Sequence, residues 1–523
     1  MSSLTVPVLR VVGIAALLVI SGCASLPTHY ERPESHALND TDTTTRLGRS
    51  SRATLQMHPG ESGFLPLPNG VDALVARIHL ADMAERSLDV QYYIWHDDLT
   101  GRLFANALLR AADRGVRVRI LVDDVGTKAN DASLLSLDSH PNVEIRLFNP
   151  VASRSFRGLG MLTDFSRVNR RMHNKAFVAD NQRAVVGGRN IGDEYFEAHG
   201  DVAFGDLDVL TMGPVVSEVS RAFDSFWDAP MSIPIGALTG RPSDAPGLDA
   251  LRVDLAAFVQ TQRDSPYVGQ ARSNLAEVLA TGAQGFHWGK AHLLVDDPAK
   301  VTRSPEDTEG HLLPQFGKLG LQLRSELLIV SPYFIPGDAG VAWLRGLVQK
   351  GLRVTVLTNS LAASDVSAVH AGYKRYREAL IEGGVHLYEL RPDAIAYGRA
   401  KGGGRQISGS HASLHAKTFV FDRRAVFIGS LNLDPRSVQL NTEIGVVCES
   451  EPFAQALAGG IEGALDQVAW RVERVAAADG RLQLVWIETS AEGVRQRFEE
   501  PGVSPWRKLG VWFLGLLPIE SQL

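Results

Sequence analysis

This sequence has very little cysteine, no apolar run long enough to span a bilayer and no excess of positive charge. Its 523 residues include only two cysteines, Cys23 and Cys448, which are too few for a disulfide framework. Neither a C-x-x-C nor an H-E-x-x-H pattern occurs, so the common zinc signatures are missing. The formal net charge is −6, so no general positive field attracts nucleic acid, and we expect no nucleic-acid partner.

What is present is a globular composition. Apolar side chains make up 45% of the residues, which is too much for a disordered chain, and 523 residues exceed what a single core usually holds. The sequence therefore predicts at least two folded domains or lobes.

The N-terminus carries Arg10 followed by an apolar run at residues 11–20. This run is too short to span a bilayer, which takes about 20 residues, but it is typical of a secretory signal. The Ile-Ser-Gly-Cys sequence that follows resembles a bacterial lipobox, which predicts a lipoprotein signal peptide at residues 1–22 and a lipid on Cys23. An uncleaved anchor or an ordinary buried cysteine is the alternative. The lipobox places the mature chain on the exported, periplasmic side of a membrane, and Ala24 favours the outer membrane over the inner one.

Both ends of the folded part carry segments with a membrane interpretation. Residues 23–60 include a polar stretch at 39–45 and are predicted to be a tether. Residues 476–523 form a C-terminal tail in which Trp506 and Trp512 flank basic side chains, a composition that suits the bilayer interface. A terminal helix packed on the body is the alternative interpretation of this tail.

The middle of the chain contains an internal repeat with a period of about 240 residues. The segment GVRVRIL at 115–121 recurs as GLRVTVL at 351–357. In each copy an apolar run and an amphipathic helical stretch come before this segment, and a further apolar run follows it, as in a parallel βαβ unit. These flanking segments are 88–95, 99–114 and 143–147 in the first copy, and 327–334, 339–350 and 385–389 in the second.

The most informative part of the repeat is a pair of identical motifs. MHNKAFVAD at 172–180 matches LHAKTFVFD at 414–422, and both read H-x-K-x4-D. Each is followed at the same distance by a G-[GS]-x-N segment, at 187–190 and 429–432. One H-x-K pattern alone is typical of any packed strand, whereas two copies inside a longer duplication indicate a catalytic pair.

The motif residues suit the chemistry of a phosphoryl group. Side chains two apart in a strand share a face, so His173 points the same way as Lys175, and His415 the same way as Lys417. If the two repeats pack about a pseudo-twofold axis, one pocket receives both pairs. The lysines then stabilise negative charge on the phosphate oxygens, while one imidazole attacks phosphorus and the other protonates the leaving alkoxide.

Several polar residues are predicted to support this pocket. Asn190, Ser430 and Asn432 follow the two motif strands and offer hydrogen-bond donors for the substrate. Two later carboxylates, Asp208 and Glu443, are candidates for orienting the imidazoles and raising their basicity.

Asp180 and Asp422 complete the two H-x-K-x4-D motifs and are grouped with the catalytic residues on that account. Each lies five residues beyond the motif lysine and therefore points to the opposite face of the strand. This parity predicts a structural role for both.

Aromatic residues end the first strand of each repeat. They are Tyr92, Tyr93 and Trp95 in the first copy, and Tyr333 and Phe334 in the second. Ligands of open parallel sheets bind at such strand ends, so these side chains either line a headgroup or acyl pocket or pack in the core.

The paired motifs resemble the phospholipase D superfamily over roughly residues 60–470. More narrowly, the segments at 171–175, 187–196, 432–437 and 505–520 resemble the bacterial cardiolipin synthases of the C type. The resemblance implies an α/β fold of two similar phospholipase D-like lobes in a pseudo-twofold arrangement, each with a mixed, mostly parallel sheet flanked by helices, and one shared active site. It also implies phosphatidyl transfer through a phosphohistidine, with phosphatidylglycerol as acceptor and phosphatidylethanolamine as donor. Neither a metal ion nor another cofactor is implied, and no obligatory protein partner is evident.

Within this family we assign His173 as the nucleophile and His415 as the general acid and base, although the pseudosymmetry leaves the reverse assignment open. A hydrolase that releases phosphatidic acid is the main alternative activity. A nuclease of the same superfamily and a lipoprotein scaffold with a relic site are further alternatives. The predicted domains are a signal at 1–22, a tether at 23–60, lobe 1 at 61–235, a connector at 236–282, lobe 2 at 283–475 and a membrane-interface tail at 476–523.

Overall fold

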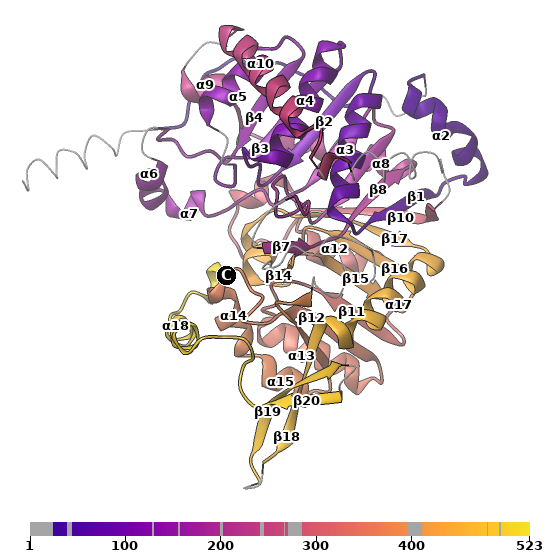
Figure 1. Ribbon diagram of the computed structural model, residues 1–523, viewed down its shortest axis with the longest axis vertical. Helices are drawn as coiled ribbons and strands as arrows, with labels where there is room; N and C mark the ends of the chain where they lie inside the picture. The colour runs from indigo at the N-terminus through magenta and orange to yellow at the C-terminus, as the bar shows by residue number, and fades with distance from the viewer. Residues whose placement is uncertain are drawn as a thin grey trace, which may run out of the picture.

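Two lobes with matching sheets make up the computed structural model (Figure 1). The structure describes residues 25–38, 44–127, 130–154, 157–198, 202–240, 245–265, 267–269, 285–394, 411–477, 480–490 and 493–523. The lobes are stacked along the long axis of the molecule, with the N-terminal half at the top of Figure 1. The prediction of two similar α/β lobes is confirmed.

Lobe 1 contains a mixed sheet. Its strands are β1 (Ser62–Leu67), β2 (Ser87–Tyr92), β3 (Arg117–Asp123), β4 (Val143–Phe148), β5 (Ala176–Ala179), β6 (Arg183–Gly187), β8 (Asp208–Met212) and β9 (Ser232–Pro234), and its helices are α3 (Gly70–Met83), α4 (Leu99–Asp113), α5 (Asp131–Asp138), α6 (Arg157–Thr163), α7 (Phe165–Val168) and α8 (Pro214–Trp227). Strands β2, β3 and β4 are parallel. Strands β5, β6, β8 and β1 continue the sheet antiparallel from β2, and β9 pairs antiparallel with β4.

Lobe 2 repeats this order. Its strands are β10 (His287–Val295), β11 (Glu326–Val330), β12 (Arg353–Asn359), β13 (His386–Leu390), β15 (Lys417–Phe421), β16 (Ala425–Gly429), β17 (Ile444–Glu449) and β18 (Ala469–Ala476), and its helices are η1 (Pro298–Val301), α12 (Leu312–Lys318), α13 (Gly337–Gln349), α14 (Ser367–Lys374), α15 (Arg377–Glu382), η2 (Arg436–Leu440) and α17 (Glu451–Val468). Strands β11, β12 and β13 are parallel, and the other pairings are antiparallel. The expectation of mostly parallel sheets was therefore wrong, because only the strands joined by βαβ crossovers are parallel neighbours in each lobe.

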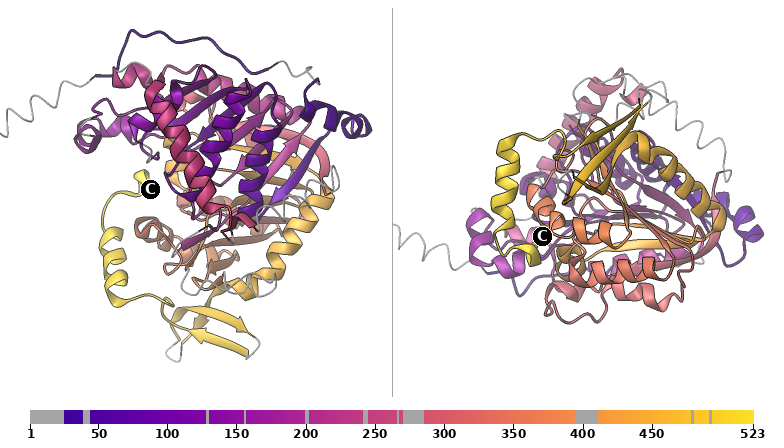
Figure 2. Two further views of the ribbon diagram at one scale, coloured as in Figure 1. Left: turned by 45° about the horizontal axis from the view of Figure 1, so that its top comes forward. Right: turned by 90° about the horizontal axis from the view of Figure 1, so that it is seen from below.

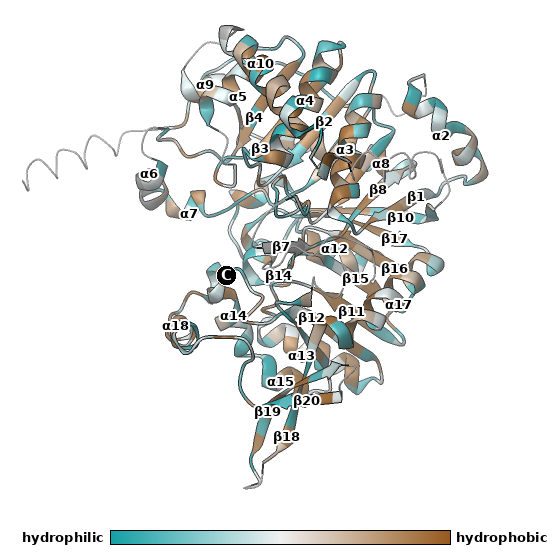
Figure 3. Cartoon of the chain, in the orientation of Figure 1, coloured by the Kyte–Doolittle hydropathy of each residue, from teal (hydrophilic) through white to brown (hydrophobic). Residues whose placement is uncertain are grey.

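The two lobes share one sheet and one core. Strand β1 of lobe 1 pairs with β10 of lobe 2, which joins both sheets into a single sheet of 18 strands. Val178 and Val186 of lobe 1 lie in the same hydrophobic core as Val426 and Ile444 of lobe 2. Figure 3 shows the hydrophobic residues gathered along the central strands of both lobes. The lobes are consequently held together by buried apolar surface as well as by strand pairing.

A second pairing joins the lobes next to the repeated H-x-K motifs. The short strands β7 (Val202–Gly205) and β14 (His411–Leu414) form a separate parallel pair, one strand from each lobe. Because β14 ends just before His415, this pairing fixes the second H-x-K motif against lobe 1.

Part of the segment predicted to be a tether is packed on lobe 1. The carbonyl oxygens of Pro33 and Ser35 accept hydrogen bonds from the buried Arg146 and Arg119, at 2.7 Å each. The following segment contains helix α2 (Arg46–Met57). The prediction of a free tether across 23–60 is therefore wrong for these residues, because buried guanidinium groups need acceptors and the segment supplies them. Residues 1–22 and Cys23 lie outside the described residues.

The segment predicted to be a connector begins as a helical part of lobe 1. Helix α9 (Ile235–Thr239) is followed by α10 (Ala245–Gln262), which lies across α4 and α5 (Figure 2). Leu248 and Leu255 of α10 belong to the core of lobe 1. The composition of 236–262 misled the prediction, because the glycine and proline residues that the structure describes there lie at the ends of these helices.

The C-terminal tail has one packed face and one exposed face. Strands β19 (Leu482–Ser490) and β20 (Gly493–Arg497) extend the edge of lobe 2 beyond β18. Helix α18 (Pro505–Gly515) then lies on the outside of lobe 2, where Val511 packs beside Leu361 and Ala371 (Figure 2). Among the described residues, no helix has the length and apolar character needed to cross a bilayer. The short helix η3 (Glu520–Gln522) ends the chain.

Candidate active site

The two H-x-K motifs lie at the start of matching strands, β5 and β15, and each is hydrogen-bonded to the opposite lobe. The backbone N–H of His173 donates to the carbonyl of Thr442 in lobe 2, at 2.9 Å. In the equivalent contact of the second repeat, the N–H of His415 donates to the carbonyl of Gly205 in lobe 1, at 2.8 Å. The predicted shared pocket therefore has a structural basis, since each motif is positioned by the backbone of the other lobe.

The residue after each of these carbonyl groups is a buried carboxylic acid that contacts an imidazole. Glu443 follows Thr442 and lies with Oε2 at 2.9 Å from Nδ1 of His173. Asp206 follows Gly205 and lies with Oδ2 at 2.6 Å from Nδ1 of His415. Each imidazole thus has Nδ1 engaged by a carboxylate from the other lobe, so Nε2 is the nitrogen that would contact a substrate.

The expected carboxylate in lobe 1, Asp208, does not take this position. It is fully buried and accepts from Nη2 of Arg77 at 2.8 Å, with Arg189 nearby at 3.5 Å. Asp206, two residues earlier, occupies the place that sequence reasoning gave to Asp208. The strand register explains this equivalence: Gly187 pairs with Asp208 and Gly429 pairs with Gly445, so Asp206 and Glu443 each lie two residues before an equivalent strand position.

Small residues beside the two carboxylates differ between the lobes. In lobe 2 the hydroxyl of Ser430 donates to Oε2 of Glu443 at 2.5 Å. Gly188 is the matching residue in lobe 1, and a side chain there would place its Cβ 2.1 Å from Oδ1 of Asp206. The glycine therefore makes room for the carboxylate, whereas the serine adds a hydrogen bond to it.

The two motif lysines are buried beside the histidines. Nζ of Lys175 donates to the carbonyl of His173 at 2.6 Å, and Nζ of Lys417 donates to that of His415. Burial lowers the pKa of Lys417 to about 8, although Asp206 opposes this effect, and lowers the pKa of Lys175 as well. The positive charges of the two ammonium groups are therefore only partly balanced by nearby carboxylates, so an anionic ligand between them would be stabilised.

The two histidines have different electrostatic surroundings. Burial lowers the pKa of His173 well below its ordinary value, and the charges of Lys175 and Lys417 lower it further. The pKa of His415 is also lowered by burial and by Lys417, but Asp206 raises it in opposition. His173 is accordingly the imidazole held neutral, while His415 is the one better able to carry a proton.

The two carboxylates strengthen this asymmetry. Burial raises the pKa of Glu443 to about 7, against the opposing influence of Lys175. For Asp206 burial acts in the same direction, but His415 and Lys417 outweigh it and hold its pKa below the usual range. Asp206 thus remains a full negative charge beside His415.

The predicted amide donors lie at the same end of the two sheets. Oδ1 of Asn190 accepts from the backbone N–H of Ile94 at 3.3 Å. Asn432 is buried and its Oδ1 has no protein partner, so its amide is partly available to a ligand. Two tyrosines pack edge-on against the imidazoles at centroid distances of 5.1 Å, Tyr93 against His173 and Tyr195 against His415. Sequence reasoning had named Tyr93 without deciding its role and had missed Tyr195.

Asp180 and Asp422 lie at the far ends of β5 and β15, away from the histidines. Oδ1 of Asp180 accepts from the backbone N–H groups of Arg86 and Ser87, and Oδ1 of Asp422 accepts from those of Ser325 and Glu326. Both aspartates adopt positive φ angles, 53° and 51°, at the turn into the next strand. Their grouping with the catalytic residues is not supported by this placement, whereas the structural role predicted from their parity agrees with it.

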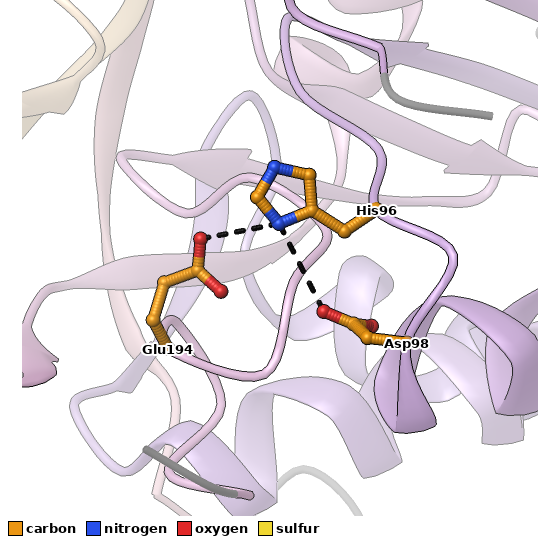
Figure 4. Close-up of side chains that lie close together, drawn as sticks. All are labelled: His96, Asp98 and Glu194. Carbon is orange, nitrogen blue, oxygen red and sulfur yellow. Dashed lines mark ion pairs between the residues drawn. The ribbon is translucent and has the colours of Figure 1, made fainter. Parts of the chain in front are cut away.

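A separate cluster of possible metal ligands is formed by His96 and Asp98, which come just before α4, and by Glu194, in the loop after β6 (Figure 4). Nδ1 of His96 lies 3.3 Å from Glu194 and 3.9 Å from Asp98. Asp98 is already engaged, because one oxygen accepts from the N–H of Gly101 at the start of α4 and the other from the N–H of Asp193. The cluster therefore joins the loop to the helix.

A two-lobed α/β fold with paired histidine–lysine motifs at one buried, carboxylate-supported site defines a phosphoryl-transfer protein of the phospholipase D class. The chain matches the family described as "Cardiolipin synthase, PLD-like domain" at residues 77–227 and 322–463, more than half of its length. The chain therefore belongs to this family of phospholipase D-like cardiolipin synthases.

Individual relatives agree with this assignment. The chain is 43% identical to cardiolipin synthase C of Escherichia coli (strain K12), over 91% of this chain and 100% of that protein. It is 26% identical to cardiolipin synthase B of the same strain, over 76% of this chain and 79% of that protein. The crystal structure of phosphatidylserine synthase from Haemophilus influenzae Rd KW20 has the same fold, with a TM-score of 0.55 and 15% identity over 91% of this chain and 100% of that one.

Proposed function

We propose that this protein is a phosphatidyltransferase that makes cardiolipin from phosphatidylglycerol and a second phospholipid, phosphatidylethanolamine. The observation that carries the proposal is the reciprocal pairing of each imidazole with a carboxylate of the opposite lobe. The family membership and the 43% identity to cardiolipin synthase C support this reaction.

In the first step, Nε2 of His173 attacks the phosphorus of the donor lipid. The proton stays on Nδ1 of His173, and this N–H donates a hydrogen bond to Glu443. Ser430 helps to hold that carboxylate in place. A phosphorus–nitrogen bond forms while the bond to the headgroup oxygen breaks, and His415 gives its proton to the departing alkoxide. The ammonium groups of Lys175 and Lys417 stabilise the charge on the nonbridging oxygens.

In the second step, His415 acts as a base. It removes the proton from a hydroxyl of phosphatidylglycerol, whose oxygen attacks phosphorus and releases His173. Asp206 supports both steps, because its negative charge stabilises the imidazolium of His415 between proton transfers.

We further propose that the protein works at a membrane on the exported side of the cell, with a lipid on Cys23 and with α18 in the bilayer interface. The outer membrane is the favoured location, because the residue that follows Cys23 is Ala24. The exposed side of α18 supports the interfacial contact: Trp506 is 81% exposed and Trp512 61%, and Leu509, Phe513 and Leu516 lie beside them.

The reaction is tested with purified, detergent-solubilised protein, a chelator, and phosphatidylglycerol with or without phosphatidylethanolamine, with the products followed by mass spectrometry. We expect cardiolipin whose yield rises when phosphatidylethanolamine is added, and none from the His173→Ala or His415→Ala variants. Phosphatidic acid as the only product would show that water is the acceptor.

The covalent step needs its own measurement. Rapid alkaline quenching followed by peptide mass spectrometry should find a phosphatidyl adduct on the peptide that contains His173. The same adduct on His415 would reverse the two roles, and cardiolipin formation in His173→Ala would overturn the shared-site mechanism.

A further inference from the structure

Lobe 2 contains a large apolar cavity that the catalytic residues do not use. It has a volume of about 740 Å³ and lies between the sheet and helices α12 and α13. Phe316, Leu321 and Leu323 line one side, and Phe419 and Phe421 of β15 form the floor. This volume lies within the range of about 300–1,000 Å³ that is typical of pockets for small molecules.

The matching position in lobe 1 is occupied by a longer helix. There α3, with 14 residues, packs along α4 and contributes Leu74 and Leu80 to the core that also contains Leu108. The corresponding helix of lobe 2 is α12, which has only seven residues and packs on β10. The cavity of lobe 2 therefore lies at the place where the two lobes differ in helix length.

One end of the cavity lies near the catalytic groups of lobe 2. Leu433 and Asp434, which directly follow the site residue Asn432, line the cavity. The backbone N–H of Ile335, also in the lining, donates to the carbonyl of Leu433 at 2.7 Å. Asp434 raises the pKa of Lys417, and Glu443 raises the pKa of Asp434, so this end of the cavity lies within electrostatic range of the catalytic groups.

The residues that line the cavity favour an apolar, hydrocarbon ligand. Most of the residues that line the cavity carry aliphatic or aromatic side chains, and its outer rim includes Trp343, which is 52% exposed, and Leu313. An apolar cavity of this kind offers water few hydrogen-bond partners, so filling it with an alkyl chain is favourable. Asp434 lies at the end nearest the catalytic centre, and burial raises its pKa to about 6, which weakens its charge there.

We propose that this cavity holds an acyl chain of a phospholipid whose phosphoryl group lies at the two histidines. The inference rests on the proposed function, which places a phospholipid there, and goes further by assigning one acyl chain to lobe 2. It follows that long-chain lipids gain binding energy from the cavity and that lipids with short chains do not.

Photo-crosslinking tests the occupancy without requiring turnover. Phosphatidylglycerol with a diazirine at the end of one acyl chain is irradiated with the full protein in detergent, and the crosslinked peptides are identified by mass spectrometry. We expect adducts in residues 312–323 and 337–349, and the same adducts in the inactive His173→Ala variant. Adducts confined to α18 or to lobe 1 would overturn the proposal. Cavity adducts without any lipid turnover would uphold it while the proposed function fails.

Kinetics with a blocked cavity give a second test. Leu321→Trp and Leu323→Trp each fill part of the cavity, and Val253→Trp, on an exposed position of α10, is the matched control. We expect the blocked variants to lose roughly tenfold or more in kcat/KM for a long-chain donor lipid, but to stay within about twofold for a dihexanoyl lipid. The control should match the parent protein on both lipids. Equal losses on long and short chains in both blocked variants, with unfolding temperatures unchanged, would contradict the proposal.

Discussion

At the scale of single residues, the two carboxylates decide which imidazole nitrogen faces the substrate. Glu443 and Asp206 each occupy Nδ1 of a histidine from the opposite lobe. Because Asp206 keeps its charge while the pKa of Glu443 is raised to about 7, the two otherwise similar halves are electrostatically unequal. This inequality favours His173 as nucleophile and His415 as acid and base, a choice that the repeated motif alone leaves open.

Replacing Asp206 with asparagine should impair proton transfer more than folding. The amide keeps the shape of the side chain but removes the negative charge, so kcat should fall by a factor on the order of 10² to 10⁴. Because Asp206 raises the pKa of His415, its loss should also move the alkaline limb of the kcat profile to lower pH. Steady-state kinetics across pH measure both effects. A change in the unfolding temperature alone, with the pH profile unmoved, would contradict this role.

Asp208→Asn is the matched control for that experiment. Asp208 pairs with the buried Arg77 and contacts neither imidazole, so its loss leaves a buried guanidinium poorly compensated. We expect a destabilisation of about 3–5 kcal/mol without a shift of the pH profile. Thermal unfolding and the kinetic profile together separate the two aspartates.

Lys417, the lysine of the second motif, predicts that substrate binding weakens at alkaline pH. The pKa of Lys417 is lowered to about 8, so its positive charge is lost as the pH rises through that value. Therefore kcat/KM should fall above about pH 8. In Lys417→Arg the guanidinium stays charged, so this limb should disappear or move upward even if the maximal rate drops. An unchanged alkaline limb in the variant would show that another group controls it.

Sequence reasoning reached most but not all of this site. The paired histidines and lysines were predictable because duplication preserves their spacing, and Glu443 because it directly precedes an apolar strand. Asp206 was missed because the D-L-D segment offers two aspartates, and only the backbone contact between Gly205 and His415 selects the first. Tyr195 was missed because its contact with His415 joins two lobes, which no local pattern records.

At the scale of elements, helix α18 joins the body of lobe 2 to an exposed apolar surface. Val511 packs inward, and Arg507 donates to the carbonyl of Ser364, which anchors the helix. The opposite face presents the two tryptophans. The two interpretations of the tail, a packed helix and an interfacial helix, are therefore compatible, because they use different faces of the same element.

Removing the exposed tryptophans should weaken membrane binding without unfolding the protein. In a Cys23→Ser background, which removes the predicted lipid, we expect Trp506→Ala with Trp512→Ala to lower vesicle partitioning by roughly 10- to 100-fold, because each indole buries apolar surface in the interface. Sedimentation with phosphatidylglycerol vesicles measures this. Met57→Ala, an exposed apolar residue on α2, is the control and should have no effect. Undiminished partitioning of the double variant would remove α18 from the proposed membrane contact.

The elements themselves were predictable where their pattern is local. Helix α4 was expected at 99–114 and occupies Leu99–Asp113, because Asp98 caps its first turn and its apolar residues recur on one face. The H-x-K motifs were expected within strands, whereas β5 begins only at Ala176 and β15 at Lys417. The strands begin late because the backbone at each histidine pairs with the opposite lobe instead of its own sheet.

At the scale of the whole molecule, neither lobe contains a complete site. Each lobe supplies one histidine and the carboxylate that the other lobe's histidine needs. The shared sheet and core fix these distances, so the lobes act as one rigid unit at the site. A duplicated fold has thereby produced one active site instead of two.

The same joining predicts that the lobes unfold together. Leu108 is buried in the core of lobe 1 and Leu380 in that of lobe 2, and replacing either with alanine should cost about 2–5 kcal/mol. If β1–β10 pairing and the common core couple the lobes, scanning calorimetry should give one transition that both variants lower alike.

Phe64→Ala, which removes a fully buried ring from the shared core, is the informative comparison. It should weaken the coupling itself, so that Leu108→Ala and Leu380→Ala in this background begin to move separate transitions. Two transitions in the unaltered protein, each moved by only one of the leucine variants, would show that the lobes are independent units and that their pairing at the site is not what holds them together.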